Sequence, residues 1–313
     1  MMKRWLVTTI ALILGCTAAF VGINYWLDPY CIFRCRPDRL IPVATNERTT
    51  KYLLGFNYIP RNFDGVLIGT SISGNWDTSK IRGYRVYNAS LSGGNAAEGA
   101  LILNNVLNHG KLRLAMFIVH PAMGDGHEPK SGSMNPQEYW GSLGSIPLIQ
   151  NYVAGILAST GRQPNECDGY GVYDFKPMMA AHAAAVPQQE KVLSLFGGQI
   201  NMAAAAPDYV DETAIEQYRK LIDKSRMSGA AIIGVIPPRR SSPGQVKTRD
   251  IYTERLVASF QPQDIVIDLD SPKLDSVRQN PESFWDGLHL TNAAADEVIE
   301  AINQSLSDLS RRY

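Results

Sequence analysis

The sequence is poor in the residues that build disulfide frameworks and metal sites. Its 313 residues include four cysteines and five histidines, too few for a disulfide scaffold. No histidine pair accompanies the spacing of Cys31 and Cys35, so a zinc site is not expected there. Cys31 or Cys35 can pair with the other or with Cys167, and the sequence leaves that choice open. Cys16 falls inside an apolar segment.

The sequence also lacks a charge imbalance and the glycine-rich motifs of nucleotide-binding proteins. Thirty basic residues balance thirty acidic ones, so the overall charge gives no reason to expect nucleic acid as a partner. Neither a Gly-x-Gly-x-x-Gly turn nor a phosphate-binding loop follows any apolar segment. We therefore expect no cofactor.

One long hydrophobic run is present, at the N-terminus. Lys3 and Arg4 precede an uncharged segment from Trp5 to Trp26, which is long enough to span a bilayer. Its apolar run continues well past the usual length of a cleaved signal, and the stretch after the lipoprotein-like Cys16 is apolar instead of polar. Residues 1–27 are thus predicted to be an uncleaved, single-pass anchor in the inner membrane. The basic residues place the rest of the chain in the periplasm or outside the cell.

The remainder of the chain alternates between apolar strand patterns and helical patterns. This alternation predicts an α/β fold, a three-layer doubly wound parallel sheet, over residues 64–313. Residues 28–63 read as a connector with one short helix over 49–58. Residues 121–211 break the alternation and are predicted to be a helical insertion, with helices over 145–158 and 177–193. The expected strands are 65–68, 84–88, 114–119, 230–236 and 265–269, and the other expected helices are 96–108, 212–227, 248–260 and 293–309.

A serine stands where ligands bind in parallel sheets. The stretch DGVLIGTSISGN ends the first strand and places Ser71 directly after it. Ligands in open α/β sheets bind at the carboxyl ends of the strands, which makes Ser71 a candidate nucleophile. The alternative is a polar turn in which Ser71 or Ser73 caps a helix.

Of the five histidines, His289 is the candidate general base. It lies in FWDGLHLTNAAADEV, before the last helix and three residues after Asp286. That spacing lets the carboxylate hold one ring nitrogen while the other accepts a proton. His109 reads as a helix C-terminal residue and His182 as an ordinary helical one. His120 and His127 flank an aspartate in HPAMGDGH, an isolated cluster for which metal binding is not expected.

These motifs, in this order, resemble the SGNH or GDSL-type hydrolase superfamily. The resemblance implies that Ser71 is the nucleophile, His289 the general base and Asp286 the group that orients it. The family's second block corresponds to VYNASLSGGNAAEG, which implies oxyanion donors at the backbone of Ser71 and Gly93, or Gly94 next. Two departures stand out: Thr70 replaces the usual aspartate, and IVHPAMGD stands where the family has Gly-x-Asn. Asn95 is a candidate substitute for that missing donor, with a helix N-cap as the alternative.

The resemblance is closest to membrane-anchored bacterial members with a Gly-Ser-Ser or Gly-Thr-Ser motif, which are often linked to the acylation of surface polysaccharides. It implies a serine esterase or O-acyltransferase acting on a small acyl ester or an acylated glycan, with acetyl as the expected group. The alternative is an inactive scaffold of the same fold that binds glycan or a membrane-bound acyltransferase. Tyr139 and Trp140 in the insertion are candidates for stacking on a sugar. At least one of Phe284 and Trp285 is expected to pack under the Asp286–His289 loop.

Overall fold

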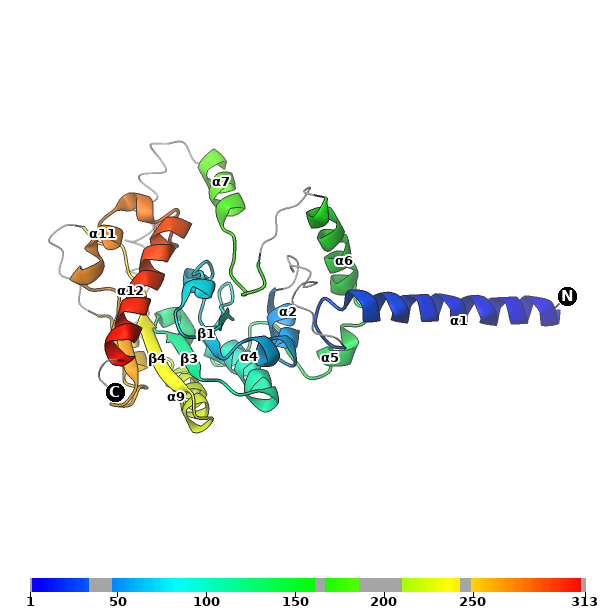
Figure 1. Cartoon of the computed structure of the whole chain (residues 1–313), viewed down its shortest axis with the longest axis horizontal. Helices are drawn as coiled ribbons and strands as arrows, with labels where there is room; N and C mark the ends of the chain where they lie inside the picture. The colour runs from blue at the N-terminus through cyan, green and yellow to red at the C-terminus, as the bar shows by residue number, and fades with distance from the viewer. Residues whose placement is uncertain (1, 34–46, 161–166, 186–209, 243–248, 311–313) are drawn as a thin grey trace.

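A parallel sheet of five strands organises the computed structural model, which describes residues 2–33, 47–160, 167–185, 210–242 and 249–310 (Figure 1). The strand order is β2-β1-β3-β4-β5, the order of flavodoxin-like doubly wound sheets. The predicted fold class is thus confirmed. The strands are β1 (Gly65–Ile68), β2 (Val86–Asn88), β3 (Leu114–Ile118), β4 (Ala231–Ile236) and β5 (Ile265–Asp268).

Each face of the sheet is covered by helices because the strands are apolar on both sides. In β1, Val66 and Ile68 face one core, while Leu67 faces the other. Helices α2 (Glu47–Leu54), α3 (Tyr58–Asn62), α4 (Ala96–His109), α9 (Glu212–Met227) and α10 (Ile251–Val257) contribute to the first core. Helices α11 (Asp275–Arg278) and α12 (Asn292–Ser310) contribute to the second.

Asx residues begin several of these helices, where the first backbone N–H groups lack partners. The side chain of Asn95 accepts a hydrogen bond from the N–H of Glu98 at the start of α4. The Asp211 carboxylate accepts from two N–H groups at the start of α9, and Asp250 caps α10 in the same way. The first residues of α4, α9 and α10 are therefore set by these side-chain caps.

The segment expected to be a connector contains structure of its own. Helices α2 and α3 lie within residues 47–63, and their apolar side chains are buried in the first core. Tyr52, Leu53 and Ile59 are almost fully buried there. Residues 47–63 therefore belong to the folded core, and residues 34–46 lie outside the described part of the chain.

The insertion is helical where it is described. It contains α5 (Glu138–Gly141), α6 (Ile146–Ser159) and α7 (Lys176–Ala185). The expected helix over 145–158 corresponds to α6, and the one over 177–193 begins as α7. Residues 186–209 lie outside the described residues, so the predicted end of that second helix is not described.

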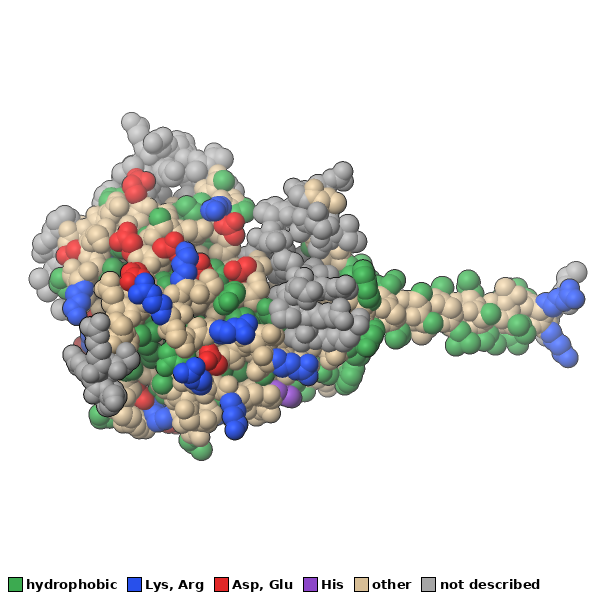
Figure 2. All heavy atoms as spheres, in the orientation of Figure 1, with side chains coloured by type: hydrophobic (Ala, Val, Ile, Leu, Met, Phe, Trp, Pro, Cys, Tyr) green, Lys and Arg blue, Asp and Glu red, His purple; other side chains and the backbone are tan. Residues whose placement is uncertain are grey.

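The N-terminal segment forms one long helix, α1 (Met2–Leu27), which extends away from the rest of the molecule (Figure 1). Its length and apolar composition suit a membrane span, and its side chains from Lys3 onward are mostly exposed. Basic side chains gather at its free end, while apolar ones cover its length (Figure 2). The helix is consistent with a single-pass anchor.

Candidate active site

Ser71 lies in a tight turn that follows β1. The turn is a single 3₁₀ segment, Ser71–Ser73, and its cap is Thr70, whose hydroxyl accepts from the N–H of Ile72 (3.4 Å). Ser73 is buried and its hydroxyl lies 2.8 Å from that of Ser90. Neither serine caps the turn, so the alternative of a capping role for Ser71 or Ser73 is not what the structure shows. Ser71 remains partly exposed at the carboxyl edge of the sheet.

The turn packs so closely that only glycine fits at its start. A Cβ at Gly69 would lie 2.3 Å from the Ser73 hydroxyl and 2.6 Å from the Ile118 side chain. Cβ atoms do not approach other heavy atoms this closely, so a larger residue at position 69 would force the buried side chains of Ser73 and Ile118 to shift. Gly69 therefore fixes where the following serine stands.

The structure brings Ser71, His289 and Asp286 together. The Ser71 hydroxyl lies 2.8 Å from His289 Nε2, and His289 Nδ1 lies 2.6 Å from an Asp286 carboxylate oxygen. Since an ionised carboxylate only accepts, Nδ1 carries the proton and Nε2 is free to accept from the serine. The two residues expected to meet across the sheet edge, 218 positions apart, do so.

The Asp286 carboxylate also holds its own loop. One oxygen accepts from the backbone N–H groups of Leu288 (3.0 Å) and His289 (2.7 Å), and Gly287 turns the chain with φ +86°. Burial alone would raise the pKa of Asp286, but the hydrogen bonds and charge of His289 and these N–H groups lower it below its ordinary value. Asp286 therefore stays ionised beside the histidine.

Aromatic rings enclose the histidine. Trp285 stacks on the His289 ring with centroids 5.4 Å apart, and Phe175 of the insertion contacts its edge at 5.8 Å. Phe284 is buried in the second core. The expectation that at least one of Phe284 and Trp285 packs as core is confirmed by Phe284.

Asn75 fastens the histidine loop to the serine turn, a role that no sequence pattern indicated. Its side-chain amide donates to the backbone carbonyl of Leu290 (2.8 Å) and to the Asn292 side chain (3.2 Å). Asn75 lies four residues after Ser71, and Leu290 directly follows His289. A buried amide that spans the two loops limits their relative movement.

The loop of the second block lies next to the serine turn. Leu91 bridges to Thr70 in parallel fashion, and its N–H donates to the carbonyl of Gly69 (3.1 Å). Across the described part of the chain, neither the N–H of Ser71 nor that of Gly93 takes part in a hydrogen bond. Gly93 has φ +59°, a conformation that favours glycine. Both N–H groups are therefore available to a ligand.

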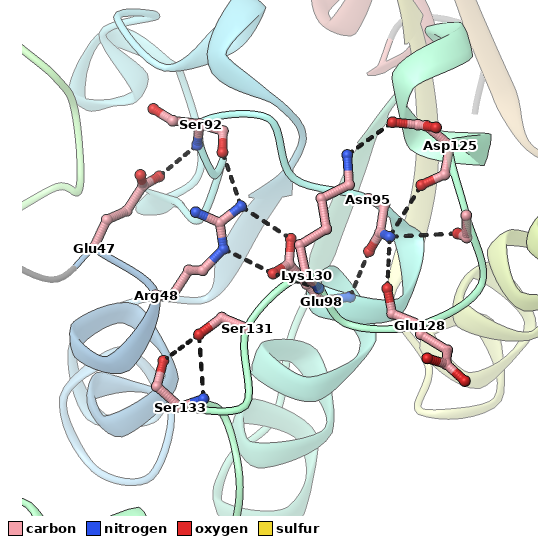
Figure 3. A network of polar contacts seen from close by, with 11 residues as sticks. Glu47, Arg48, Ser92, Asn95, Glu98, Asp125, Glu128, Lys130, Ser131 and Ser133 are labelled. Atoms are coloured by element: carbon pink, nitrogen blue, oxygen red, sulfur yellow. Dashed lines mark hydrogen bonds and ion pairs between the residues drawn. The ribbon is translucent and has the colours of Figure 1, made fainter.

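Two other candidates for oxyanion binding have different partners. The N–H of Gly94 donates to the carbonyl of Leu91 (2.9 Å). Asn95 is the N-cap of α4, and its amide donates to the carbonyls of Asp125, Gly126 and Glu128 (Figure 3). Asn95 therefore anchors the loop after β3, which corrects the expectation that it substitutes for the missing asparagine.

Helix α2 clamps the second-block loop through three polar side chains. Glu47 accepts a hydrogen bond from the N–H of Ser92 (2.7 Å), and Arg48 donates one to the Ser92 carbonyl (2.9 Å) (Figure 3). Arg48 also forms an ion pair with buried Glu98 (Figure 3). Buried Lys51 donates to the carbonyls of Ser90 (2.7 Å) and of Gly171 in the insertion (3.0 Å). A segment outside the predicted domain thus shapes the loop that contains Gly93.

The remaining histidines take structural partners. His109 ends α4 and its Nδ1 lies 2.8 Å from the carbonyl of Asn105. In HPAMGDGH the three polar groups separate: His120 accepts from the N–H of Ala122, His127 lies 3.2 Å from Asp211, and Asp125 pairs with Lys130. The side chain of His182 lies outside the described residues.

Tyr139 and Trp140 lie at the base of α1, away from the triad. The Tyr139 hydroxyl contacts Asn57 and the carbonyl of Ile32, and its ring packs on Phe56. Trp140 packs against Phe33, near the end of the N-terminal helix. These contacts correct the expectation that the pair binds substrate at the site.

A polar cleft lies beside the Asn75 bridge, and none of the three triad residues is among its lining residues. Asn75 and Asn292, which fasten the histidine loop, form part of its wall. Carboxylates, amides and ammonium groups dominate the lining, with one tyrosine. The other lining residues are Asp77, Lys80, Asp168, Val172, Tyr173, Asp174, Lys176 and Asp296.

Comparison with known proteins leaves the function open. No protein-family model and no curated protein matches the chain. Among solved structures, the crystal structure of TesA matches with a TM-score of 0.36 and 15% sequence identity, over 78% of this chain and 98% of that one. This similarity is too low to support a function, so the function is inferred from the site itself.

Proposed function

We propose that the chain is an SGNH-type serine esterase or O-acyltransferase, and that Ser71, His289 and Asp286 are its catalytic residues. The observation that carries this proposal is the continuous hydrogen-bonded series from the Ser71 hydroxyl through both ring nitrogens of His289 to Asp286. A nucleophile, a base and a group that fixes the base's tautomer are the parts that acyl transfer requires.

The proposed reaction proceeds in two halves. Ser71 Oγ attacks the acyl carbon as His289 Nε2 takes its proton, and the N–H groups of Ser71 and Gly93 stabilise the oxyanion. The protonated His289 then gives the proton to the leaving alcohol oxygen, which leaves an acyl-serine. In the second half, water or an acceptor hydroxyl loses its proton to His289 and attacks the acyl carbon. His289 then returns that proton to Ser71 Oγ as the bond between Ser71 and the acyl group breaks.

The cleft favours a polyhydroxylated substrate. Carboxylate and amide side chains such as Asp77, Asn75 and Asn292 accept and donate hydrogen bonds to hydroxyl groups, and Tyr173 offers a ring face. The substrate we propose is an acyl ester of a glycan, with acetyl as the acyl group. We place the domain on the periplasmic side of the inner membrane, because Lys3 and Arg4 precede the apolar helix.

Labelling with a serine-reactive fluorophosphonate tests the proposal. We expect the full-length protein to be labelled, Ser71→Ala to lose the label, and Ser79→Ala to keep it, since Ser79 is outside the hydrogen-bonded series. An unlabelled wild-type protein would overturn the proposal and favour a scaffold that keeps the fold and binds glycan or an acyltransferase partner.

A further inference from the structure

An exposed apolar stripe runs along α6, the helix of the insertion closest to α1. Ile146, Ile149 and Val153 have relative exposures of 72%, 51% and 52%. Their spacing of three and four residues places them on one side of the helix. Leu148, Asn151 and Ala154 are buried on the other side, and α6 contains no charged residue. A helix that leaves this much apolar surface uncovered in water calls for a partner.

The stripe is joined to the end of α1 by specific contacts. The Tyr152 hydroxyl donates to the Asn24 side chain (2.7 Å), and the Asn151 amide donates to the Tyr30 hydroxyl (2.7 Å). Tyr25 packs on Phe33, and Phe33 packs on Trp140, which is 63% exposed. The apolar surface therefore continues from the anchor helix onto the insertion.

The direction and depth of α6 suit the surface of a bilayer. Helix α6 runs across the end of α1, so it would lie along the membrane plane if α1 spans it (Figure 1). Apolar side chains gather on the side of the domain from which α1 emerges (Figure 2). A Cβ at Gly144 would lie 3.3 Å from the Phe20 ring. Phe20 lies seven residues, or roughly 10 Å of helix, before the end of α1, which matches the depth of interfacial helices.

We propose that α6 and Trp140 form a second membrane-contacting surface, in which the Ile146–Ile149–Val153 stripe inserts into the headgroup and upper acyl region beside α1. The occupant is the lipid bilayer. The proposal rests on the membrane placement of α1 within the proposed function and is independent of the catalytic roles. Trp140 then acts as an interfacial aromatic residue, which accounts for its exposure.

Photolabelling by lipid tests this surface. The full-length protein is placed in phosphatidylethanolamine and phosphatidylglycerol vesicles that contain a phospholipid with a diazirine near the top of its acyl chain, and the adducts are mapped by mass spectrometry. We expect adducts on peptides that contain Ile146, Ile149 and Val153, comparable to those around Tyr25. Met227 (88% exposed) and Ile251 (57% exposed) are apolar controls far from α1 and should carry none.

A charged variant and its matched control complete the test. Ile146→Glu with Ile149→Glu should lower adducts on α6 to the level at Met227 and leave adducts on α1 unchanged, while Met227→Glu should change neither. Adducts on α1 with none on α6 would overturn this surface and keep the anchor. Cross-links between the α6 helices of two copies, without lipid adducts, would assign the stripe to a second copy instead. No adducts on α1 would contradict the anchor itself and, with it, this surface.

A separate observation concerns His120, which follows β3 as Ser71 follows β1. The two strands pair in parallel with Ile68 opposite Phe117. Ser71 and His120 each lie three residues beyond this pair, so they stand at the same level of the carboxyl edge on neighbouring strands. His120 is also close enough to His289 for the two ring charges to affect each other.

The tautomer of His120 is fixed by its hydrogen bond. Its Nδ1 accepts from the N–H of Ala122 (3.2 Å), so a neutral ring carries its proton on Nε2. Burial lowers the pKa of His120 to about 4. The charge of Asp250 opposes this shift, while those of Arg239 and His289 add to it. The ring is thus an uncharged donor at neutral pH. Within the described ranges, the hydrogen bond found for the ring is the one at Nδ1, and none is found at Nε2.

We infer that the Nε2–H of His120 donates to the oxyanion, as a side-chain donor beside the N–H groups of Ser71 and Gly93. This inference deepens the proposed function. His120→Ala should lower kcat for an acyl ester by about a hundredfold to a thousandfold with little change in KM, and His120→Asn should recover part of the loss. His109→Ala, at the C-terminus of α4, is the matched control and should leave kcat unchanged.

The outcomes separate the two proposals. An active, Ser71-labelled wild type with an unchanged kcat in His120→Ala would overturn the role of His120 alone. A loss that appears in KM instead of kcat would assign His120 to substrate binding and also overturn it. A wild type that neither reacts with fluorophosphonate nor turns over esters would overturn the proposed function and the oxyanion role together.

Discussion

At the residue scale, the tautomer of His289 decides what the site can do. The Asp286 carboxylate accepts from Nδ1, which leaves Nε2 unprotonated and facing the Ser71 hydroxyl at 2.8 Å. With the opposite tautomer, Nε2 would carry a proton and repel that of the serine. The proposed chemistry therefore depends on a carboxylate that holds the histidine and does not itself react.

Replacing Asp286 by asparagine tests this dependence. The amide nitrogen would donate to Nδ1 and shift the ring proton to Nε2, so we expect turnover to fall by about 10⁴. The amide oxygen can still accept from the N–H groups of Leu288 and His289, so the thermal midpoint should change little. Ester hydrolysis and circular dichroism measure the two effects. Unchanged turnover would mean that another group orients the histidine.

The pH dependence follows from the same three residues. Only a neutral imidazole can accept the serine proton, so kcat/KM should fall as the pH is lowered from about 8 toward about 5. Asp286, with its lowered pKa, stays ionised over this range, and His120, with a pKa of about 4, stays neutral. A single ionisation should fit the acidic limb. Two steps in that range would show that a further group titrates.

The sequence predicted the proximity of Ser71, His289 and Asp286 because each follows from a local rule. Ser71 ends an apolar strand, His289 precedes the last helix, and parallel strands bring such loops to one edge. Asn75 and Lys51 follow from no such rule. They act through carbonyl groups far along the chain, as Lys51 does at Gly171, and any buried polar residue would look the same in the sequence.

At the scale of elements, α2 is the support of the second-block loop. Its polar side chains hold Ser90 and Ser92, while its apolar side chains pack in the first core. The composition of residues 28–63 suggested a connector, because charge and proline are frequent there. The burial of Glu98 at the start of α4 explains why a cation from α2 is needed.

Arg48→Met tests this support. Glu98 is fully buried and would lose its ion pair, which typically costs about 3–5 kcal/mol in the free energy of unfolding. Arg48→Met combined with Glu98→Gln should recover a large part of that loss. Urea unfolding monitors stability, and Arg82→Met, which breaks the exposed pair with Glu300, is the control with an expected change within about 1 kcal/mol. Equal effects of the two single variants would contradict a supporting role for the buried pair.

The insertion shows why aromatic residues are hard to assign from sequence. Exposed tyrosine and tryptophan occur both at sugar sites and at membrane interfaces, since each ring has an apolar face and a polar edge. Tyr139 and Trp140 belong to the α1 end of the molecule because of their contacts with Ile32 and Phe33. These contacts are between residues far apart in the sequence, so they can be seen only in the folded chain. The tyrosine that lines the polar cleft is Tyr173.

At the scale of the whole molecule, the charges that precede α1 predict an orientation in the membrane. Lys3 and Arg4 stand before the apolar helix, so we expect residues after Asp28 to lie outside the cytoplasm. A C-terminal reporter that is active only outside the cytoplasm should be active. Lys3→Glu with Arg4→Glu should lower the active fraction. A wild-type fusion with a reporter active only in the cytoplasm would contradict the orientation if it gave signal.

Two sets of hydrogen bonds hold the junction between α1 and the domain, one within residues 28–33 and one to α6. Asp28 accepts from the N–H groups of Ile32 and Phe33, and Asn24 and Tyr30 bond to α6. A domain on a long flexible linker occupies many heights and tilts above the membrane. Its effective concentration near any one target is low, because the domain is distributed over that whole volume. A domain joined rigidly to a membrane-spanning α1 would stay at a constant distance from the bilayer. Lateral diffusion in the membrane plane would then determine which acyl groups it meets.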